Sequence, residues 1–312
     1  MMALFAALIF MLPTLLLAGS VRDFGAVGDG VTDNTQAINA ALSTGGAVFV
    51  PPGTYLFSGP LQIPNDTTLY GVYGQSILKI AAGAWTGPRF PYPPVTNRQR
   101  NGGRNVNVSD LVIDGNIAGN PNAGAPGVLL SFRGNLRGFQ ISRIIFKGYP
   151  GATGPTPYGG APLGIGAPGQ ADVSHGVVAD CTFLNKRGGA LVVFGPRNHI
   201  LNNLIESPSD AAFGAQGPMA WENTFRGNVT RNLTIPNMFA LYVEGASRNL
   251  FINNLMQNSH AIAISDFGIG DAIQNSFIEN PLANPKGPLV TFIRSGFRVD
   301  SNLIVNGGVI ID

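Results

Sequence analysis

Charge, cysteine and histidine are scarce in this sequence, and each shortage excludes a class of protein. Charged residues make up 12% of the chain and the net charge is +2, which does not indicate the concentrated basic face of a nucleic-acid-binding protein. The single cysteine, Cys181, excludes an internal disulfide framework. We expect Cys181 to be a small buried hydrophobe. His175, His199 and His260 lack metal-ligand spacing, so no zinc site is predicted.

Residues 1–20, MMALFAALIFMLPTLLLAGS, form an apolar run that ends in small residues. We predict a signal peptide with cleavage near Ala18 to Ser20, followed by one domain over residues 21–312 of a secreted, extracellular protein. Because the run lacks a basic N-terminal region, an uncleaved anchor is the alternative. No later stretch is apolar enough to cross a bilayer, so no membrane contact is expected after cleavage.

Glycine is abundant, with 42 residues, and together with low charge it favours an all-β protein with many turns. One helix is predicted over residues 33–42, DNTQAINAAL, with Asp33 as N-cap and Gln36 completing a capping box. Its expected apolar face is Ala37, Ile38, Ala41 and Leu42. We interpret the acids of this region, Asp23, Asp29 and Asp33, as turn and cap residues. Residues 46–60 follow as two strands separated by the turn at 51–53.

Two long segments rich in proline and glycine interrupt the strand-like sequence. Residues 84–104 and 148–170 are poor in β-branched residues, so we expect both to leave the body of the domain as loops.

A repeated phrase appears from about residue 106, in which a polar residue, usually asparagine, lies between apolar ones. Its polar position is occupied by Cys181, Asn203, Asn223, Asn254, Asn275 and Asn302, with spacings of 22, 20, 31, 21 and 27 residues. Such a period predicts a β-solenoid, because no helical pattern recurs. We expect the asparagines to bond from rung to rung as an internal ladder.

Each repeat also contains a second strand, at 189–195, 211–217, 239–245, 260–266, 288–294 and 307–312. Two apolar columns are predicted to point inward: Leu191, Phe213, Leu241, Ile262, Val290 and Val309, and Val193, Ala215, Val243, Ile264, Phe292 and Ile311. The alternate column is predicted to point outward and contains Phe194, Gln216, Glu244, Ser265, Ile293 and Asp312.

The opening sequence VRDFGAVGDGVTDNTQAINAAL, followed by GGAVFVPPGTYLFSGPL and TLYGVYGQSILKI, resembles the N-terminal module of the pectate-lyase-like, right-handed parallel β-helix superfamily. That group includes rhamnogalacturonase- and epimerase-type proteins and phage tailspikes. The resemblance implies an all-β, right-handed parallel β-helix in which a short N-terminal helix caps the first rung and residues 21–80 form the cap and first rungs. It also implies action on a polysaccharide. The motifs DD, R-I-K and D-P-H-E of its hydrolases and epimerases are missing, so their catalytic residues are not carried over.

Hydrolysis of a glycosidic bond requires two carboxylates. Glu244 and Asp266 lie on successive predicted rungs, about 6 Å apart if the strand ends at Ser265, and we predict them as the catalytic pair. We predict that Tyr242, Gln216 and Arg294 bind the substrate, an acidic, pectin-like polysaccharide.

Two other functions remain open. A lyase would need a base such as Arg294, Arg187 or Lys186, and a Ca²⁺ ion that Asp210, Glu244 and Asp266 could hold. A non-catalytic carbohydrate-binding or adhesion solenoid is the alternative outside the enzymes. We slightly prefer the hydrolase, which needs no cofactor.

The last strand-like segment, GGVIID, has no evident cap. Because an exposed last rung is an unpaired edge, we expect a second subunit of a homo-oligomer or a missing C-terminal part to cover it.

Overall fold

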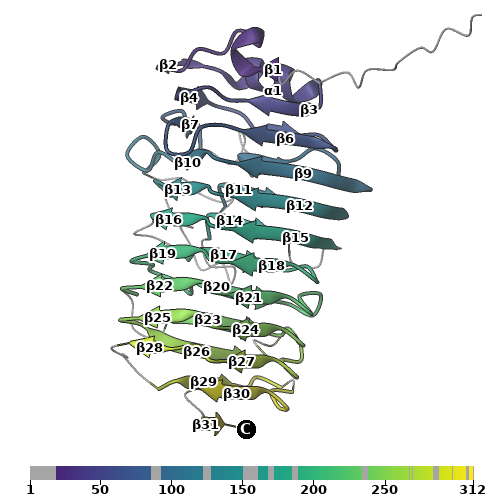
Figure 1. Ribbon diagram of the computed structural model, residues 1–312, viewed down its shortest axis with the longest axis vertical. Helices are drawn as coiled ribbons and strands as arrows, with labels where there is room; N and C mark the ends of the chain where they lie inside the picture. The colour runs from purple at the N-terminus through teal and green to yellow at the C-terminus, as the bar shows by residue number, and fades with distance from the viewer. Residues whose placement is uncertain are drawn as a thin grey trace, which may run out of the picture.

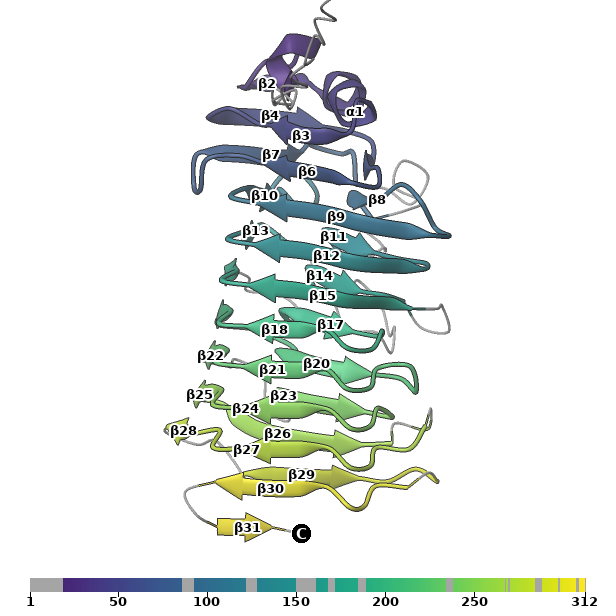
Figure 2. The ribbon, with the colours of Figure 1, turned by 45° about the vertical axis from the view of Figure 1, so that its right-hand side comes forward.

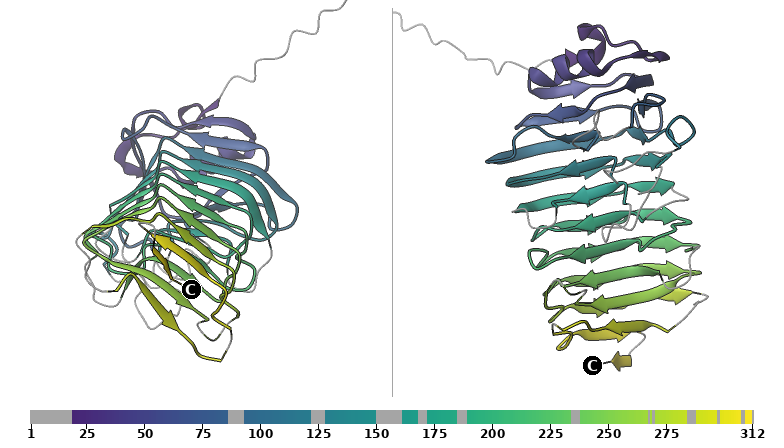
Figure 3. Two further views of the ribbon diagram at one scale, coloured as in Figure 1. Left: turned by 60° about the horizontal axis from the view of Figure 1, so that its bottom comes forward. Right: turned by 180° about the vertical axis from the view of Figure 1, so that it is seen from behind.

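The chain winds into a right-handed parallel β-helix, in which each rung contributes one short strand to each of three sheets (Figure 1). The computed structural model describes residues 19–85, 93–121, 128–149, 161–167, 172–184, 189–233, 238–266, 268, 270–283, 288–296, 298–306 and 309–311. The rungs stack along one axis from α1 at one end to β31 at the other (Figures 2 and 3). The predicted fold class is therefore confirmed.

Sheet 1 is the longest of the three. Its strands are β1 (Gly19–Ser20), β3 (Gly46–Phe49), β6 (Thr67–Tyr70), β9 (Gly103–Ser109), β12 (Leu136–Ser142), β15 (Val173–Ala179), β18 (His199–Leu201), β21 (Thr224–Arg226), β24 (Leu250–Ile252), β27 (Ser276–Ile278), β30 (Leu303–Asn306) and β31 (Val309–Ile311).

Sheet 2 follows sheet 1 along each rung. Its strands are β2 (Asp29–Asp33), β4 (Gly53–Phe57), β7 (Ser76–Ile80), β10 (Val112–Asp114), β13 (Ile145–Lys147), β16 (Thr182–Leu184), β19 (Leu204–Glu206), β22 (Val229–Arg231), β25 (Leu255–Gln257) and β28 (Leu282–Ala283).

Sheet 3 completes each rung and carries the candidate site. Its strands are β5 (Leu61–Ile63), β8 (Val95–Asn97), β11 (Leu130–Phe132), β14 (Leu163–Ile165), β17 (Leu191–Val193), β20 (Phe213–Gln216), β23 (Phe239–Glu244), β26 (His260–Ser265) and β29 (Val290–Ile293). Two of them, β8 and β14, lie in the segments that we expected to be loops. Val95, Leu163 and Ile165 are fully buried there, so that prediction is wrong for these strands.

The helix α1 (Thr35–Ser43) covers the first rung, together with the short 3-10 helix η1 (Val21–Phe24). Ile38, Ala41 and Leu42 are buried as predicted, because they form the apolar face of α1. Asp33 is not the N-cap, and the predicted capping box is wrong: the N-cap is Asn34. Asp33 lies one residue earlier, where it accepts hydrogen bonds from the Thr35 N–H and hydroxyl and from the Ser58 hydroxyl.

The other acids of the opening segment are turn residues, as expected. Asp29 accepts hydrogen bonds from the N–H and the hydroxyl of Thr32 and from the N–H of Val31. Together these three bonds lower the pKa of Asp29 to about 2. Asp23 accepts the N–H of Ser20 at 2.9 Å. These carboxylates fix the cap and need no catalytic explanation.

The core is a set of apolar columns that run along the axis. Phe225, Phe251 and Phe277 stack face to face, with ring centroids 4.4 and 4.6 Å apart and planes 6° and 7° from parallel. These separations match the spacing of neighbouring parallel strands, about 4.8 Å. The inward columns of sheet 3 are in the predicted register, since Leu191 pairs with Phe213, then Leu241, Ile262 and Val290.

The last rung departs from that prediction. Strand β31 turns back and pairs antiparallel with β30 in sheet 1, so Val309 and Ile311 do not extend the columns of sheet 3. Phe292, predicted to point inward, is 42% exposed because no described strand pairs with β29 on its outer side. Asp312 lies outside the described residues.

Two ladders of buried asparagines, rather than one, mark two corners of the β-helix. The corner between sheets 1 and 2 contains Asn203, Asn228, Asn254 and Asn280, and the corner between sheets 3 and 1 contains Asn198, Asn223, Asn249, Asn275 and Asn302. Within each ladder the Oδ1 atom accepts a backbone N–H from the preceding asparagine at 2.9–3.0 Å. These two corners thus satisfy buried backbone groups from within the rung stack.

The single predicted column combined the two ladders and is wrong in that respect. Asn203 and Asn254 belong to one corner, whereas Asn223, Asn275 and Asn302 belong to the other. The phrase occurs twice in each rung, so successive occurrences in the sequence can belong to different ladders. Within one ladder the spacing is 25 to 27 residues. Cys181 precedes Asn203 in its column, where it is buried and its thiol has a pKa raised by burial to about 12, as expected of an inert core residue.

Replacing Asn228 with alanine tests the ladder. Asn228 Oδ1 accepts both the backbone N–H and the side-chain amide of Asn203, and its own amide donates to Ile200 and Asn254. We expect Asn228→Ala to lower the free energy of unfolding by about 2–4 kcal/mol in urea titrations, because buried donors lose their acceptor. Asn107→Ala, which removes one 3.3 Å bond to Thr68 on a half-buried position, should cost under about 1 kcal/mol. Equal losses in the two variants would contradict the ladder's role.

Candidate functional site

The outward face of sheet 3 contains the candidate site. Gln216, Glu244 and Ser265 are Cα partners on β20, β23 and β26, so the predicted outward column is in register. Gly214, Tyr242 and Ala263 form the next outward column in the same way. Parallel pairing therefore places the polar side chains of three rungs side by side.

Side chains from this face and from neighbouring turns partly cover it. Val192, Phe194, Tyr242 and Ala263 form a small apolar cluster with Ala161, against which Ala211 and Phe239 pack. Tyr242 lies over Gly214, where a Cβ atom would be 2.4 Å from the tyrosine ring. A glycine at this position is therefore required for Tyr242 to lie on the sheet. Tyr242 as a whole is only 8% exposed, so the face of its ring is not open to a ligand.

Glu244 ends β23 and is the most perturbed carboxyl group of the site. It keeps partial exposure, but desolvation and the negative charge of Asp210 raise its pKa to about 7. A carboxyl group with this pKa is partly protonated at neutral pH, which is the property that a general acid needs.

Asp210 is the second carboxyl group of the site and comes from the turn before β20. Burial raises the pKa of Asp210 as well. The Ala211 N–H, from which Asp210 Oδ1 accepts a hydrogen bond at 2.7 Å, acts in the opposite direction. Burial raises the pKa of Tyr242 well above its usual value, and the charges of Glu244 and Asp210 raise it further. Tyr242 therefore stays protonated and remains a hydrogen-bond donor. Asp210 also faces Tyr149, whose pKa it raises together with burial.

Asp266 has different surroundings. Strand β26 ends at Ser265, as the prediction required, but Asp266 is completely buried. Its carboxylate accepts the N–H groups of Gly268 at 3.0 Å, Ser295 at 2.6 Å and Gly296 at 3.0 Å. These bonds tie two loops together, so Asp266 acts as a loop-fixing residue, whereas Asp210 is the carboxylate whose charge acts on the pKa of Glu244.

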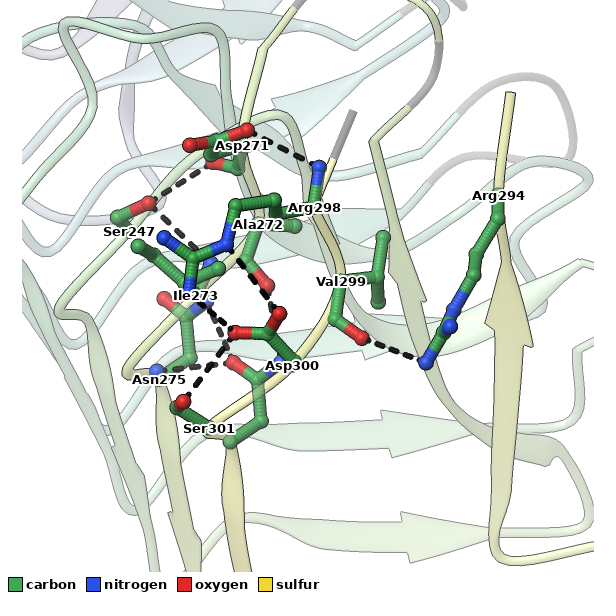
Figure 4. Close-up of polar contacts among 11 residues, drawn as sticks. Ser247, Asp271, Ala272, Ile273, Asn275, Arg294, Arg298, Val299, Asp300 and Ser301 are labelled. Atoms are coloured by element: carbon green, nitrogen blue, oxygen red, sulfur yellow. Dashed lines mark hydrogen bonds and ion pairs between the residues drawn. The ribbon is translucent and has the colours of Figure 1, made fainter. Parts of the chain in front are cut away.

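The two remaining predicted substrate-binding residues lie in unlike places. Gln216 is in the row beside Glu244 but is only 3% exposed. Arg294 follows β29 and donates to the carbonyl of Val299 at 2.9 Å (Figure 4). It is exposed on the loop where Arg298 pairs with Asp300, and nothing in its contacts joins it to Glu244. Lys186 and Arg187 lie outside the described residues.

The described residues contain no group of three histidine, cysteine, aspartate or glutamate side chains that could hold a metal ion. Asp210, Glu244 and Asp266, which we expected could hold Ca²⁺ in a lyase, do not form such a group among the described residues. Among the same residues, no helix has the length and apolar character needed to span a membrane.

Comparison with known proteins identifies related sequences. The family model described as "Rhamnogalacturonase A/epimerase, pectate lyase-like" matches residues 18–240. The preneck appendage protein of Bacillus phage PZA is 33% identical over 98 residues, which are 31% of this chain and 11% of the phage protein. Mannuronan C5-epimerase AlgE6 of Azotobacter vinelandii is 36% identical over 116 residues, which are 32% of this chain and 12% of the epimerase. The chain thus spans about a tenth of the length of these relatives.

Solved structures share the fold over most of the chain at low identity. PfbA, a surface adhesin of Streptococcus pneumoniae, has a TM-score of 0.58 at 16% identity, covering 93% of this chain and 89% of the adhesin. The A-module of AlgE6 has a TM-score of 0.53 at 18% identity, covering 93% and 94%. Tailspike protein 2 of bacteriophage CBA120 has a TM-score of 0.61 at 12% identity, covering 92% and 43%.

The raised pKa of Glu244 predicts how stability depends on pH. The folded protein holds the Glu244 proton up to about pH 7, whereas the unfolded chain releases it near pH 4.5, so this group lowers stability as pH rises between those values. We expect Glu244→Gln to be more stable than the wild type by about 2 kcal/mol at pH 8, and to differ little at pH 5, in urea unfolding. The exposed Glu222→Gln should show no such pH-dependent difference. The same stability difference for Glu244→Gln at both pH values would argue against a desolvated carboxyl group.

Proposed function

The chain belongs to the rhamnogalacturonase A/epimerase, pectate lyase-like family, and on that premise we propose that it hydrolyses glycosidic bonds in an acidic polysaccharide. The observation that carries this proposal is the desolvated carboxyl group of Glu244 on the outward face of sheet 3, whose pKa is raised by burial and by the charge of Asp210 from the turn before β20. The names of relatives support a polysaccharide as the substrate class, since they include mannuronan epimerases.

Glu244 is the general acid in this mechanism. Its pKa of about 7 lets it carry a proton near neutral pH and donate it to the oxygen of the glycosidic bond as that bond breaks. Desolvation and the charge of Asp210 raise the energy of the ionised form, which favours a proton on Glu244 before reaction.

Asp210 is the second carboxyl group, in the role of base or nucleophile. Two coupled carboxyl groups in a desolvated site do not both ionise easily, so one retains the proton while the other is charged. The pKa of Tyr242 is raised well above its usual value, so Tyr242 stays protonated over the pH range in which Glu244 and Asp210 titrate. Its hydroxyl can therefore donate a hydrogen bond to a sugar oxygen or to the ionised carboxylate. Gln216 is the Cα partner of Glu244 and only 3% exposed, which favours a role in orienting the acid over a role in binding sugar from solvent.

Export from the cell and covering of the last rung belong to the same proposal. Residues 1–20 have the composition of a signal peptide, and a polysaccharide substrate of this kind is met outside the cell. Phe292 and Ile293 expose 42% and 43% of their surface on β29, an edge strand against which a second subunit would pack.

Turnover assays distinguish the proposed hydrolase from its alternatives. The full chain is incubated with polygalacturonate, alginate and a neutral glucan. We expect new reducing ends from an acidic polymer, without unsaturated uronates. Glu244→Gln and Asp210→Asn should each lower kcat/KM by at least about 100-fold, since each removes an acid–base group, while Glu206→Gln on sheet 2 should not. Unsaturated uronate products would indicate a lyase, and a folded protein without any product would indicate a binding protein.

The pH dependence of the reaction provides an independent check. Because Glu244 must be protonated, kcat/KM should fall above about pH 7, approaching tenfold per pH unit. Asp210 must be ionised, so a second fall is expected on the acidic side. A rate that stays constant from pH 6 to pH 9 would exclude Glu244 as the acid.

A further inference from the structure

A second surface of interest lies on the turns that lead from sheet 3 to sheet 1. A groove of about 520 Å³ crosses the turns of five successive rungs. Its walls include Gly102, Asn135, Arg137, Asp172, Met219 and Trp221. This groove does not contain Glu244, Asp210 or Tyr242, although β20, which ends at Gln216, leads directly into the turn of Met219 and Trp221.

Arg133 lies two residues before Asn135, which is part of the groove wall. Arg133 is half-buried in the turn that continues to Asn135, and its buried Nε atom has no hydrogen-bond partner among the described residues. Burial and the positive charge of Arg100 both lower the pKa of Arg133. A buried guanidinium N–H without an acceptor, next to a second guanidinium, favours the binding of an anion.

Further cations continue along the groove. Arg137 makes no ion pair among the described residues, and its Nη2 lies 3.3 Å from Nε2 of His175. Desolvation and the charges of Arg137 and Arg197 lower the pKa of His175, while Asp172 acts in the opposite direction. The groove wall at this point thus carries the cation of Arg137 together with the carboxylate of Asp172.

Trp221 holds two more guanidinium groups in place. Arg197 lies 4.4 Å and Arg248 5.2 Å from the centre of the indole ring, one from the preceding rung and one from the following rung. Arg197 is neutralised by Glu222 at 3.0 Å, whereas Arg248 makes no ion pair among the described residues. Stacking on an indole orders both side chains and leaves the charge of Arg248 available to a ligand.

We propose that this groove binds a stretch of a polyuronate chain, with its carboxylates on Arg137, which lines the groove, and on Arg133 and Arg248 in the adjoining turns. Guanidinium groups match carboxylates in geometry, and Asp172 and Asn135 can bond the hydroxyl groups that such a chain carries between its charges. A nucleic acid fits less well, because Asp172 and Glu222 would repel its phosphates and Trp221 already carries two arginines. The proposal requires no bond cleavage and holds whether or not Glu244 is catalytic.

Binding is measured by calorimetry on the full-length Glu244→Gln protein, so that turnover does not consume the ligand. The probes are an oligogalacturonate and a neutral galactan oligosaccharide of the same length. We expect the oligogalacturonate to bind at least about tenfold more tightly, and Arg137→Gln and Arg133→Gln each to raise Kd about tenfold, because each removes a charged hydrogen bond. Arg231→Gln, an exposed arginine on sheet 2, serves as the matched control and should leave Kd unchanged.

His175 provides a readout at the groove itself. The charged and titratable groups that act on it are Arg137, Arg197, Asp172 and His199. A carboxylate bound at Arg137 should raise the pKa of His175 in an NMR titration, and the neutral oligosaccharide should not. If the arginine variants weakened binding only by loosening the fold, no carboxylate would bind at Arg137, and the pKa of His175 would not shift when the oligogalacturonate is added.

Several results would overturn the proposal. They are equal affinity for the charged and neutral oligosaccharides, unchanged affinity in folded Arg137→Gln and Arg133→Gln, or equally tight binding of single-stranded DNA. The proposed hydrolysis is judged separately: wild-type turnover without oligogalacturonate binding in the groove would contradict the groove alone, and binding without turnover would contradict the hydrolase alone.

Discussion

Parallel pairing from rung to rung is the constraint on which the rest of this structure depends. Each residue must lie about 4.8 Å above its equivalent, so every rung has to bend at the same places with the same backbone. The corner residue before the asparagine is left-handed in rung after rung, at φ near +55° in Arg197, Glu222 and Arg248. This conformation costs about 1 kcal/mol for such residues, and the asparagine bonds that follow offset it by satisfying the buried corner.

Much of this architecture can be predicted from the sequence, because a period of two residues fixes which side chains point inward. The columns of β17, β20, β23 and β26 followed from that alternation alone. The asparagine ladders could not be separated in the same way, since two corners of each rung carry nearly the same phrase. Strands β8 and β14 were missed because proline and glycine surround them, and only pairing with neighbouring strands makes three residues such as Leu163–Ile165 a strand.

The candidate site shows a similar division. Glu244 was predicted because it is a polar residue in an outward column, and its register is confirmed. Its proposed partner depends on tertiary packing: Asp266 is nearer in the repeat pattern, yet three backbone N–H groups hold it within loops. Asp210 lies in a turn whose path no periodicity describes. Desolvation, which raises the pKa of both Glu244 and Asp210, likewise arises from side chains brought together by folding.

The chain passes directly from the outward face of sheet 3, which carries carboxyl groups, to the turns of the groove, which carry arginines. Strands of sheet 3 end at Gln216 and Glu244, and the chain then passes into the turns that carry Trp221 and Arg248. Carboxyl groups that must hold a proton would repel a uronate carboxylate as soon as they ionise, and they gain nothing from binding it. Arginines on the adjoining turns can bind that charge at a distance from Glu244. Under the proposed function, affinity for an acidic chain and acid catalysis on its uncharged glycosidic oxygen would require different side chains, and consecutive segments of the rungs would supply them.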